Sequence, residues 1–218
     1  MRSTYRSFAA TAAVIVMSLV PCVAAAQNLK PVQLPAPRTE GGKPLMDVLK
    51  SRQSARVFSP DALPQQVLSN LLWAAFGVNR PDGRRTAPSA RNWQEIDIYV
   101  VLPEGAYLYD AKSHALKPVV AGDHRAVTGT QAYVATTPVN LVYVADYART
   151  GQAPPEEREL FPPADAGFVA ENAYLFCASE GLAVVVRGLI DRTALAKVLN
   201  LRADQKIILA QTIGFPKK

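Results

Sequence analysis

The chain has 218 residues, of which 49% are apolar and 19% are charged, with only two Cys and two His. This composition is typical of globular proteins and excludes the disordered, collagen-like and coiled-coil classes. The 24 Lys and Arg against 18 Asp and Glu give a net charge of +6. No basic stripe interleaved with aromatic residues accompanies this charge, so no nucleic-acid partner is predicted.

The first 26 residues have the pattern of a signal peptide for export. Arg2 and Arg6 precede an apolar run over residues 8–20, and small residues lead to a cleavage site at Ala26/Gln27. The run is shorter than the roughly 20 residues that a membrane-spanning helix needs. A buried N-terminal helix is the alternative interpretation. Cleavage would make the mature protein periplasmic or secreted, with no membrane anchor.

Removal of the signal peptide changes both the charge and the thiol count. It takes away two arginines and no acid, so the net charge falls from +6 to +4, and Cys177 is left as the only thiol. An exported chain with one cysteine forms no internal disulfide. His114 and His124 lie ten residues apart, and no Cys/His cluster has ligand spacing. We therefore predict no metal site and expect both histidines at the surface.

The rest of the chain predicts one α+β domain over residues 44–218, preceded by an extended arm over residues 27–43 that is rich in Pro and Gly. Apolar spacing predicts helices, the second capped by Asp61 and the third apolar nearly all round, and alternating or continuous apolar runs predict strands. The expected helices cover residues 44–52, 61–77, 164–181 and 192–199, and the expected strands cover residues 96–102, 106–109, 116–119, 139–144, 182–186 and 207–213.

The chain lacks the motifs of several common enzyme classes. It contains no GxGxxG, no phosphate-binding GxxxxGK, no GxSxG elbow and no HExxH. A Ser-His-Asp triad assembled in space from His114 or His124 stays open, although the polar, loop-like surroundings of both residues favour ordinary surface histidines.

The first of three local clusters directly follows the first predicted helix. It is Arg52-Gln53-Ser54-Ala55-Arg56, which places two guanidinium groups and a hydroxyl within five residues. Arginine offers planar, bidentate donors and serine a further O–H, so the cluster suits a phosphate. The alternative is a solvated basic helix end, which the helix dipole favours.

Two further clusters lie in a loop and at the C-terminus. Pro88, Ser89, Asn92 and Gln94 form a Pro-Ser turn with amides able to pair with the edge of a heteroaromatic ring. A polar loop that leads into a strand is the alternative for this cluster. The third cluster, residues 214–218, is a Gly-Phe-Pro turn followed by two lysines, and its alternative is a frayed basic tail.

Together, in this order and spacing, the three clusters resemble the flavin-dependent nitroreductase family, and especially its exported members related to thiazoline-oxidising dehydrogenases. The resemblance runs from about Pro44 to Pro216. It implies a three-layer α/β/α sandwich around a mixed, mainly antiparallel sheet. It also implies a homodimer with FMN at the subunit interface, so that one protomer carries only half of each site.

The resemblance assigns the phosphate end of the flavin to the first cluster and the C-terminus. Arg52, Ser54 and Arg56, with Gln53 between them, are implied to hold the FMN phosphate and ribityl chain. A cation near the C-terminus is implied to contact the same phosphate, and Lys217 is the candidate.

The resemblance assigns the flavin ring to two other segments. Asn92 is implied to hydrogen-bond the ring edge near N5 and O4, on a loop shaped by Pro88 and Ser89. Arg187 is implied to be a cation near N1 and O2, where negative charge accumulates on reduction. The stretch implied to face the ring with its backbone comprises Val186, Arg187 and Gly188.

The activity that follows is that of an oxidoreductase. Electrons would pass by a ping-pong scheme through flavin N5, from NAD(P)H or another donor to a small organic acceptor such as a nitroaromatic or a quinone. No catalytic side chain is predicted, because the flavin supplies the chemistry. Two alternatives stay open: a flavin-binding electron carrier without dedicated turnover, and a flavin-free ligand-binding protein of the same fold.

Overall fold

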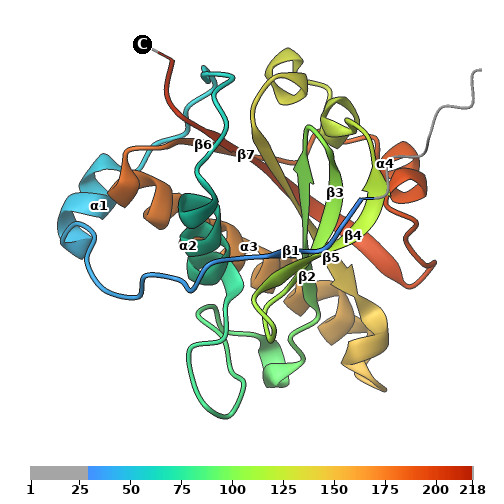
Figure 1. Ribbon diagram of the computed structural model, residues 1–218. Helices are drawn as coiled ribbons and strands as arrows, with labels where there is room; N and C mark the ends of the chain where they lie inside the picture. Colours follow the sequence, from blue (N-terminus) through green and yellow to red (C-terminus); the bar gives the residue numbers. More distant parts are fainter. Residues whose placement is uncertain (1–28, 218) are drawn as a thin grey trace, which may run out of the picture.

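The computed structural model describes residues 29–217, and the predicted signal peptide, residues 1–26, lies outside them. A single seven-stranded sheet with the order β1-β4-β3-β2-β5-β7-β6 forms the centre of the molecule (Figure 1). Every pair of neighbouring strands is antiparallel. The strands are β1 (Val32–Gln33), β2 (Ile96–Leu102), β3 (Gly105–Asp110), β4 (Ala115–Ala121), β5 (Val139–Asp146), β6 (Ala183–Arg187) and β7 (Gln205–Gly214).

Helices cover both faces of this sheet. The helices α1 (Leu45–Ser51), α2 (Gln65–Phe76) and α3 (Pro155–Glu180) lie on one face, and α4 (Arg192–Val198) lies on the other (Figure 1). None of the described helices is long and apolar enough to cross a membrane. The result is the predicted three-layer α+β fold, with a sheet that is wholly antiparallel in the described residues rather than mixed.

The two buried cores explain the three layers. Along β2, Ile98 and Val100 face the core under α2 and α3, whereas Tyr99 and Val101 face the core under α4. This period of two is that of a strand buried on both faces. The central strand β5 is buried along its whole length, as its apolar sequence predicts.

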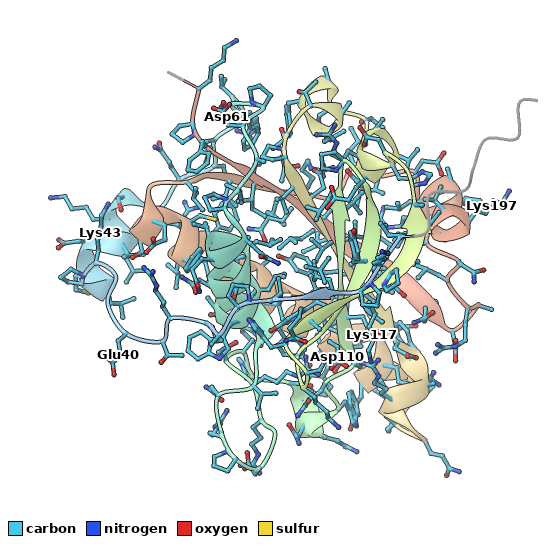
Figure 2. The ribbon with its side chains drawn as sticks, in the orientation of Figure 1. Glu40, Lys43, Asp61, Asp110, Lys117 and Lys197 are labelled. Carbon is cyan, nitrogen blue, oxygen red and sulfur yellow. The ribbon has the colours of Figure 1, made fainter. Side chains whose placement is uncertain are left out.

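Two helix boundaries differ from the sequence predictions. The central helix α3 starts at Pro155 instead of residue 164 and continues through Pro162 and Pro163. Proline usually marks a helix boundary because it lacks an N–H, so the sequence hides this start. The predicted cap Asp61 is also wrong. The helix α2 begins after Pro64, and the Asp61 carboxylate accepts a hydrogen bond from Ser59 Oγ at 2.5 Å on the loop before it (Figure 2).

Charge pairs on the sheet edge are solvent-facing. Lys117 Nζ lies 2.6 Å from Asp110 Oδ2 across the β3–β4 hairpin (Figure 2). This contact lowers the pKa of Asp110 to about 2. Exposed pairs of this kind contribute little to stability, so the fold depends on the two cores instead.

The N-terminal arm is fastened to the domain at several points. Its strand β1 pairs with β4, with Val32 opposite Leu116. Further along, Arg38 N donates to Asn70 Oδ1 at 2.9 Å, and Lys43 N donates to Ser179 Oγ at 2.9 Å. The arm therefore lies across α2 and α3 before it enters α1.

Candidate functional site

The Arg52–Arg56 segment runs along the open edge of the sheet. The helix α1 ends at Ser51, and Ala55 N then donates to Val184 O of the edge strand β6 at 2.9 Å. This backbone bond holds the segment extended. Gln53, Ser54 and Arg56 are exposed, whereas Arg52 is half-buried.

Tyr174 of α3 joins this segment to β6. Its hydroxyl lies 2.8 Å from Ser54 Oγ and accepts a hydrogen bond from Val186 N at 2.8 Å. The guanidinium of Arg52 lies 5.2 Å from the centre of the same ring, within range of a cation–π contact. Sequence analysis did not single out Tyr174 for this role, because nothing in a helix pattern shows which hydroxyl reaches a neighbouring segment.

The C-terminal turn lies beside the first cluster. Phe58 pairs with Pro216 in an antiparallel bridge, and Ser59 N donates to Phe215 O at 2.8 Å. Lys217 follows directly, so the structure brings the first and third clusters together although 158 residues separate Phe58 from Pro216. Among the residues that the structure describes, Arg52, Arg56 and Lys217 form no ion pair.

Arg187 has a different environment from the one we expected. It is 4% exposed, and its guanidinium donates to Thr212 Oγ1 at 2.9 Å, to Thr128 O at 2.7 Å and to Asn140 Oδ1 at 3.0 Å. Burial lowers the pKa of Arg187 to about 10, so it stays charged. A Cβ at Gly129 would collide with this guanidinium. The geometry gives Arg187 a structural place inside the protein rather than one facing a ligand.

The other two residues of that stretch divide. The Val186 amide is already committed to the Tyr174 hydroxyl, so it is not free to face a flavin ring as expected. Gly188, at the end of β6, has open space where a side chain would begin. Of the 186–188 stretch, only Gly188 lies at a position with room beside its backbone.

The second cluster forms a tight loop before β2. Ser89 Oγ accepts a hydrogen bond from Gln94 N at 2.8 Å, and Gln94 Nε2 donates to Asn92 Oδ1 at 3.0 Å. Pro88 and Asn92 are exposed, whereas Ser89 and Gln94 are half-buried. The loop therefore holds its own polar groups together while it presents Asn92 outward.

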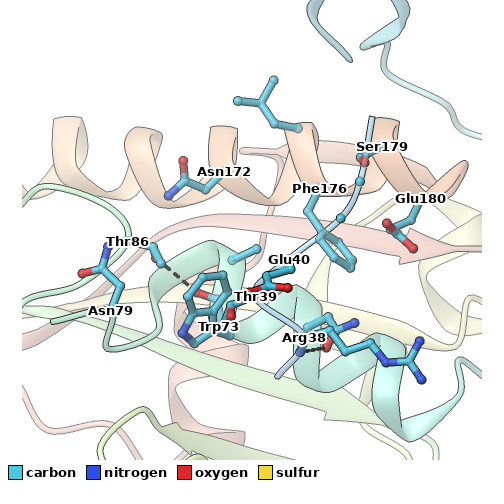
Figure 3. Close-up of a pocket in the computed structure, with 15 residues that line it drawn as sticks. Arg38, Thr39, Glu40, Trp73, Asn79, Thr86, Asn172, Phe176, Ser179 and Glu180 are labelled. Carbon is cyan, nitrogen blue, oxygen red and sulfur yellow. Dashed lines mark hydrogen bonds between the residues drawn. The ribbon is translucent and has the colours of Figure 1, made fainter. Parts of the chain in front are cut away.

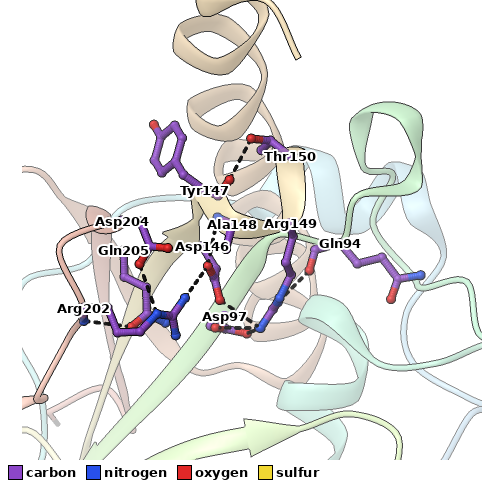
Figure 4. Close-up of polar contacts among 10 residues, drawn as sticks. All are labelled: Gln94, Asp97, Asp146, Tyr147, Ala148, Arg149, Thr150, Arg202, Asp204 and Gln205. Atoms are coloured by element: carbon purple, nitrogen blue, oxygen red, sulfur yellow. Dashed lines mark hydrogen bonds and ion pairs between the residues drawn. The ribbon is translucent and has the colours of Figure 1, made fainter. Parts of the chain in front are cut away.

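An ion network fixes the end of this loop. Arg149 donates to Gln94 O at 2.9 Å and lies 2.8 Å from Asp97 Oδ1 (Figure 4). On the other side of Asp97, Asp146 lies 2.7 Å from Arg202. Burial raises the pKa of Asp97, and the Arg149 charge opposes that rise. The network ties the start of β2 to the end of β5.

Within one protomer, the first and second clusters lie apart. The first cluster contacts α3 at Tyr174, and the second contacts α3 at Asp165, whose carboxylate accepts from Ala90 N at 2.8 Å. Nine residues of helix separate these contacts by roughly 13 Å. Figure 1 shows the segment after α1 at the upper left and the loop after α2 at the bottom.

A cavity of about 620 Å³ lies under the N-terminal arm and does not contain the predicted site residues (Figure 3). Trp73 of α2 and Phe176 of α3 supply its aromatic walls, and Arg38, Glu40 and Glu180 supply charges. Its lining is mixed in character, and no motif of the sequence analysis falls on it.

His114 is not the surface histidine we expected. It is half-buried, with Nε2 lying 2.7 Å from Ser69 Oγ and Nδ1 lying 2.9 Å from the Tyr109 hydroxyl. Ser69 Oγ also donates to Pro35 O of the arm at 2.6 Å. The Ser69 proton is therefore used on a carbonyl, and His114 Nε2 must carry the other proton. This arrangement fastens the arm and is not that of a nucleophile with its base.

The fold and its clusters define a class: an α+β sandwich whose exposed cations at the edge of the sheet suit an anionic ligand. The model of the nitroreductase family matches residues 49–215. A nitroreductase-family protein of Methanocaldococcus jannaschii is 30% identical over 168 residues, which are 72% of this chain and 85% of that protein. The chain belongs to the nitroreductase family, and family membership makes it an oxidoreductase of the flavoprotein type.

Solved structures agree. A nitroreductase-family protein from Ralstonia eutropha JMP134 is 46% identical, with a TM-score of 0.84 over 93% of this chain and 97% of that one. The NADPH:FMN oxidoreductase of Vibrio harveyi, solved with NAD⁺, is 22% identical, with a TM-score of 0.61 over 80% of this chain and 69% of that one. At that identity the second likeness concerns the fold alone.

Proposed function

We propose that the protein is an FMN-dependent oxidoreductase in which Arg52, Ser54, Arg56 and Lys217 bind the flavin phosphate. The observation that carries the proposal is the group of cations without carboxylate partners in the described residues, gathered beside one hydroxyl. Exposed arginines usually find acidic neighbours or solvent, whereas three cations around one serine suit a dianionic group.

The hydroxyl of Ser54 fits this assignment. Because Tyr174 accepts from Val186 N, its own O–H is able to donate to Ser54 Oγ at 2.8 Å. In that arrangement the Ser54 proton is free to donate to a phosphate oxygen. Tyr174 thus orients Ser54, and the Ala55 backbone bond to β6 keeps Arg52 and Arg56 on either side of it.

FMN, when bound, supplies two-electron redox chemistry at N5, so donor and acceptor can react in turn by a ping-pong scheme. The chain's own task is to bind and orient. The exposed amide of Asn92 is placed to hydrogen-bond a ring edge, and the open backbone at Gly188 leaves room for a flat ring. NAD(P)H is the proposed donor, and a nitroaromatic or quinone is the proposed class of acceptor.

We further propose that the site is completed by a second copy of the chain. The two clusters contact α3 nine residues apart, at Asp165 and Tyr174. A two-fold axis through the middle of α3 would bring each cluster opposite the other cluster of the partner. Phe168, near that midpoint, is 48% exposed, and α1 adds exposed Leu45 and Met46. Such apolar exposure supports burial in a dimer.

The dimer is tested by Phe168→Glu, which should give monomers in analytical ultracentrifugation and lose FMN together with the interface. Ala203→Glu places the same charge on an exposed turn after α4 and should change neither. A Phe168→Glu dimer that retains FMN would remove α3 from the interface.

The function is tested by the absorbance spectrum of the purified protein before and after FMN addition, followed by steady-state oxidation of NAD(P)H with a nitroaromatic or quinone. A bound flavin spectrum with turnover supports the proposal. A bound flavin without turnover favours the electron carrier, and protein that does not bind added FMN favours the flavin-free alternative.

Export is the remaining proposal. It is supported by the charged, apolar and small-residue segments of residues 1–26. N-terminal sequencing of protein from the periplasm or medium should start at Gln27. Full-length protein found only in the cytoplasm would contradict export.

A further inference from the structure

The loop Ser89–Gln94 has an unusual backbone. Arg91, Asn92 and Gln94 have φ of 49°, 55° and 49°, in the left-handed region that glycine prefers. Asn adopts this region readily, but Arg and Gln do so only at a cost. A loop of this kind persists only where its surroundings hold it, so the groups that hold it determine how Asn92 is presented.

Two buried carboxyl groups hold the loop from beneath. Ser89 Oγ donates to Glu95 Oε2 at 3.0 Å and accepts from Gln94 N at 2.8 Å. Ala90 N donates to Asp165 Oδ2 at 2.8 Å. Glu95 is 0% exposed and Asp165 is 3% exposed. Both ends of the loop are therefore fixed to the carboxyl pair, one from β2 and one from α3.

The charge on this pair is not compensated by a cation. In the part of the chain that the structure describes, neither carboxyl forms an ion pair, and Glu95 Oε1 has no donor. The groups that face Glu95 are Asp165 from α3, the Ser89 hydroxyl from the loop and the Tyr147 phenol after β5. Two adjacent buried carboxylates cannot both be ionised without a large penalty.

We propose that Glu95 and Asp165 share one proton and act as positioning residues that hold the Ser89–Gln94 loop, and hence Asn92, in its flavin-facing conformation. A hydrogen bond between the two carboxyls uses the oxygen of Glu95 that otherwise has no partner. Loss of the shared proton places two negative charges together under the loop and releases it. The positioning role rests on the proposed function, whereas the proton-linked loop does not.

Burial, together with the Asp165 charge, raises the pKa of Glu95 to about 7. A proton-linked change of the loop is therefore expected near neutral pH. Trp93 lies inside the loop, with its ring centre 6.1 Å from that of Phe161, and is one of two tryptophans. In a Trp73→Phe background its fluorescence reports on the loop without any flavin.

The first experiment follows Trp93 emission against pH in the Trp73→Phe chain and in the same chain with Glu95→Gln, Asp165→Asn or the exposed control Glu104→Gln. We expect a transition with a midpoint near pH 7 in the parent and the control. It should vanish in Glu95→Gln and move to lower pH in Asp165→Asn, where an amide replaces the neighbouring negative charge. An unchanged transition in Glu95→Gln, or none in the parent, would overturn the shared proton.

The second experiment measures the dissociation constant of FMN between pH 6 and pH 8.5. The wild-type chain should bind about tenfold more weakly at the higher pH, the change that a linkage of one pKa unit produces. Glu95→Gln should show a flatter profile. Equal profiles for the two would overturn the positioning role. Failure of both to bind FMN at any pH would refute the proposed function while the Trp93 result still decides the loop.

Discussion

The two halves of the proposed site are built in opposite ways. The Arg52–Arg56 segment is exposed, extended along β6, and carries cations with no described carboxylate partner. The Ser89–Gln94 loop is strained and is held from beneath by the buried Glu95 and Asp165. One half is ready for a ligand at the surface, and the other depends on the interior. Substitutions should therefore separate ligand affinity from stability in the first half and combine them in the second.

The largest effect is expected on ligand binding. Arg52→Ala with Arg56→Ala removes two charge-assisted contacts worth about 1.5–3 kcal/mol each, so FMN affinity should fall by at least two orders of magnitude. The melting temperature should hardly change, because neither side chain forms an ion pair with the described residues. Arg84→Ala, which removes an exposed arginine elsewhere, is the matched control for a titration of FMN by fluorescence quenching.

A third arginine near the same strand should behave in the reverse way. Arg187→Ala leaves Asn140 Oδ1 and Thr128 O without their donor and opens a cavity, so the free energy of unfolding should fall by about 4 kcal/mol. Urea unfolding measures this loss, and Arg187→Lys should recover only part of it. If Arg187→Ala kept full stability but lost FMN, the ligand-facing role expected from the sequence would be restored.

The loop half predicts a stabilising substitution. The pKa of Glu95 is raised from 4.5 in the unfolded chain to about 7, so the folded protein gives up stability as pH rises through this window. Glu95→Gln removes that loss. It should be about 3 kcal/mol more stable than wild type at pH 8 and nearly equal to it at pH 4. Urea midpoints at the two pH values test this, and a destabilised Glu95→Gln at pH 8 would contradict it.

The smallest expected effect concerns the arm. Tyr109→Phe removes the hydroxyl that donates to His114 Nδ1, at a cost of about 1 kcal/mol. Burial lowers the pKa of His114, so stability should also fall as pH drops below about 6.5. Thermal unfolding at pH 5 and pH 8 checks both statements. FMN affinity should stay unchanged, because the contact lies on the α2 side of the arm.

The sequence predicted the fold from patterns that packing directly imposes. The alternation along residues 96–102 and the apolar run at 139–144 are consequences of a sheet buried on both faces, and both became strands. The start of α3 was missed because Pro162 and Pro163 stand inside the helix. The cap at Asp61 was missed because local side-chain chemistry there favours a turn with Ser59.

The site was predictable only where its chemistry lies at the surface. Arg52, Ser54 and Arg56 are recognisable by residue type and spacing, and the structure adds Lys217 beside them. Tyr174 became visible only when α3 met the edge of the sheet. Glu95 gave no signal, since a glutamate before a strand usually lies in solvent. Buried polar partners depend on contacts between distant segments, and no local pattern contains them.

The central claim is that each flavin site takes Arg52–Arg56 from one protomer and the Asn92 loop from the other. Stoichiometry in a mixed dimer tests it most directly. One chain carries Arg52→Ala with Arg56→Ala, and the other carries Asn92→Asp, which keeps the left-handed backbone and puts a charge at the ring edge. The purified mixed dimer should bind one FMN per two chains with wild-type affinity, although each parent homodimer binds weakly. A mixed dimer that binds no better than its parents would contradict the shared site.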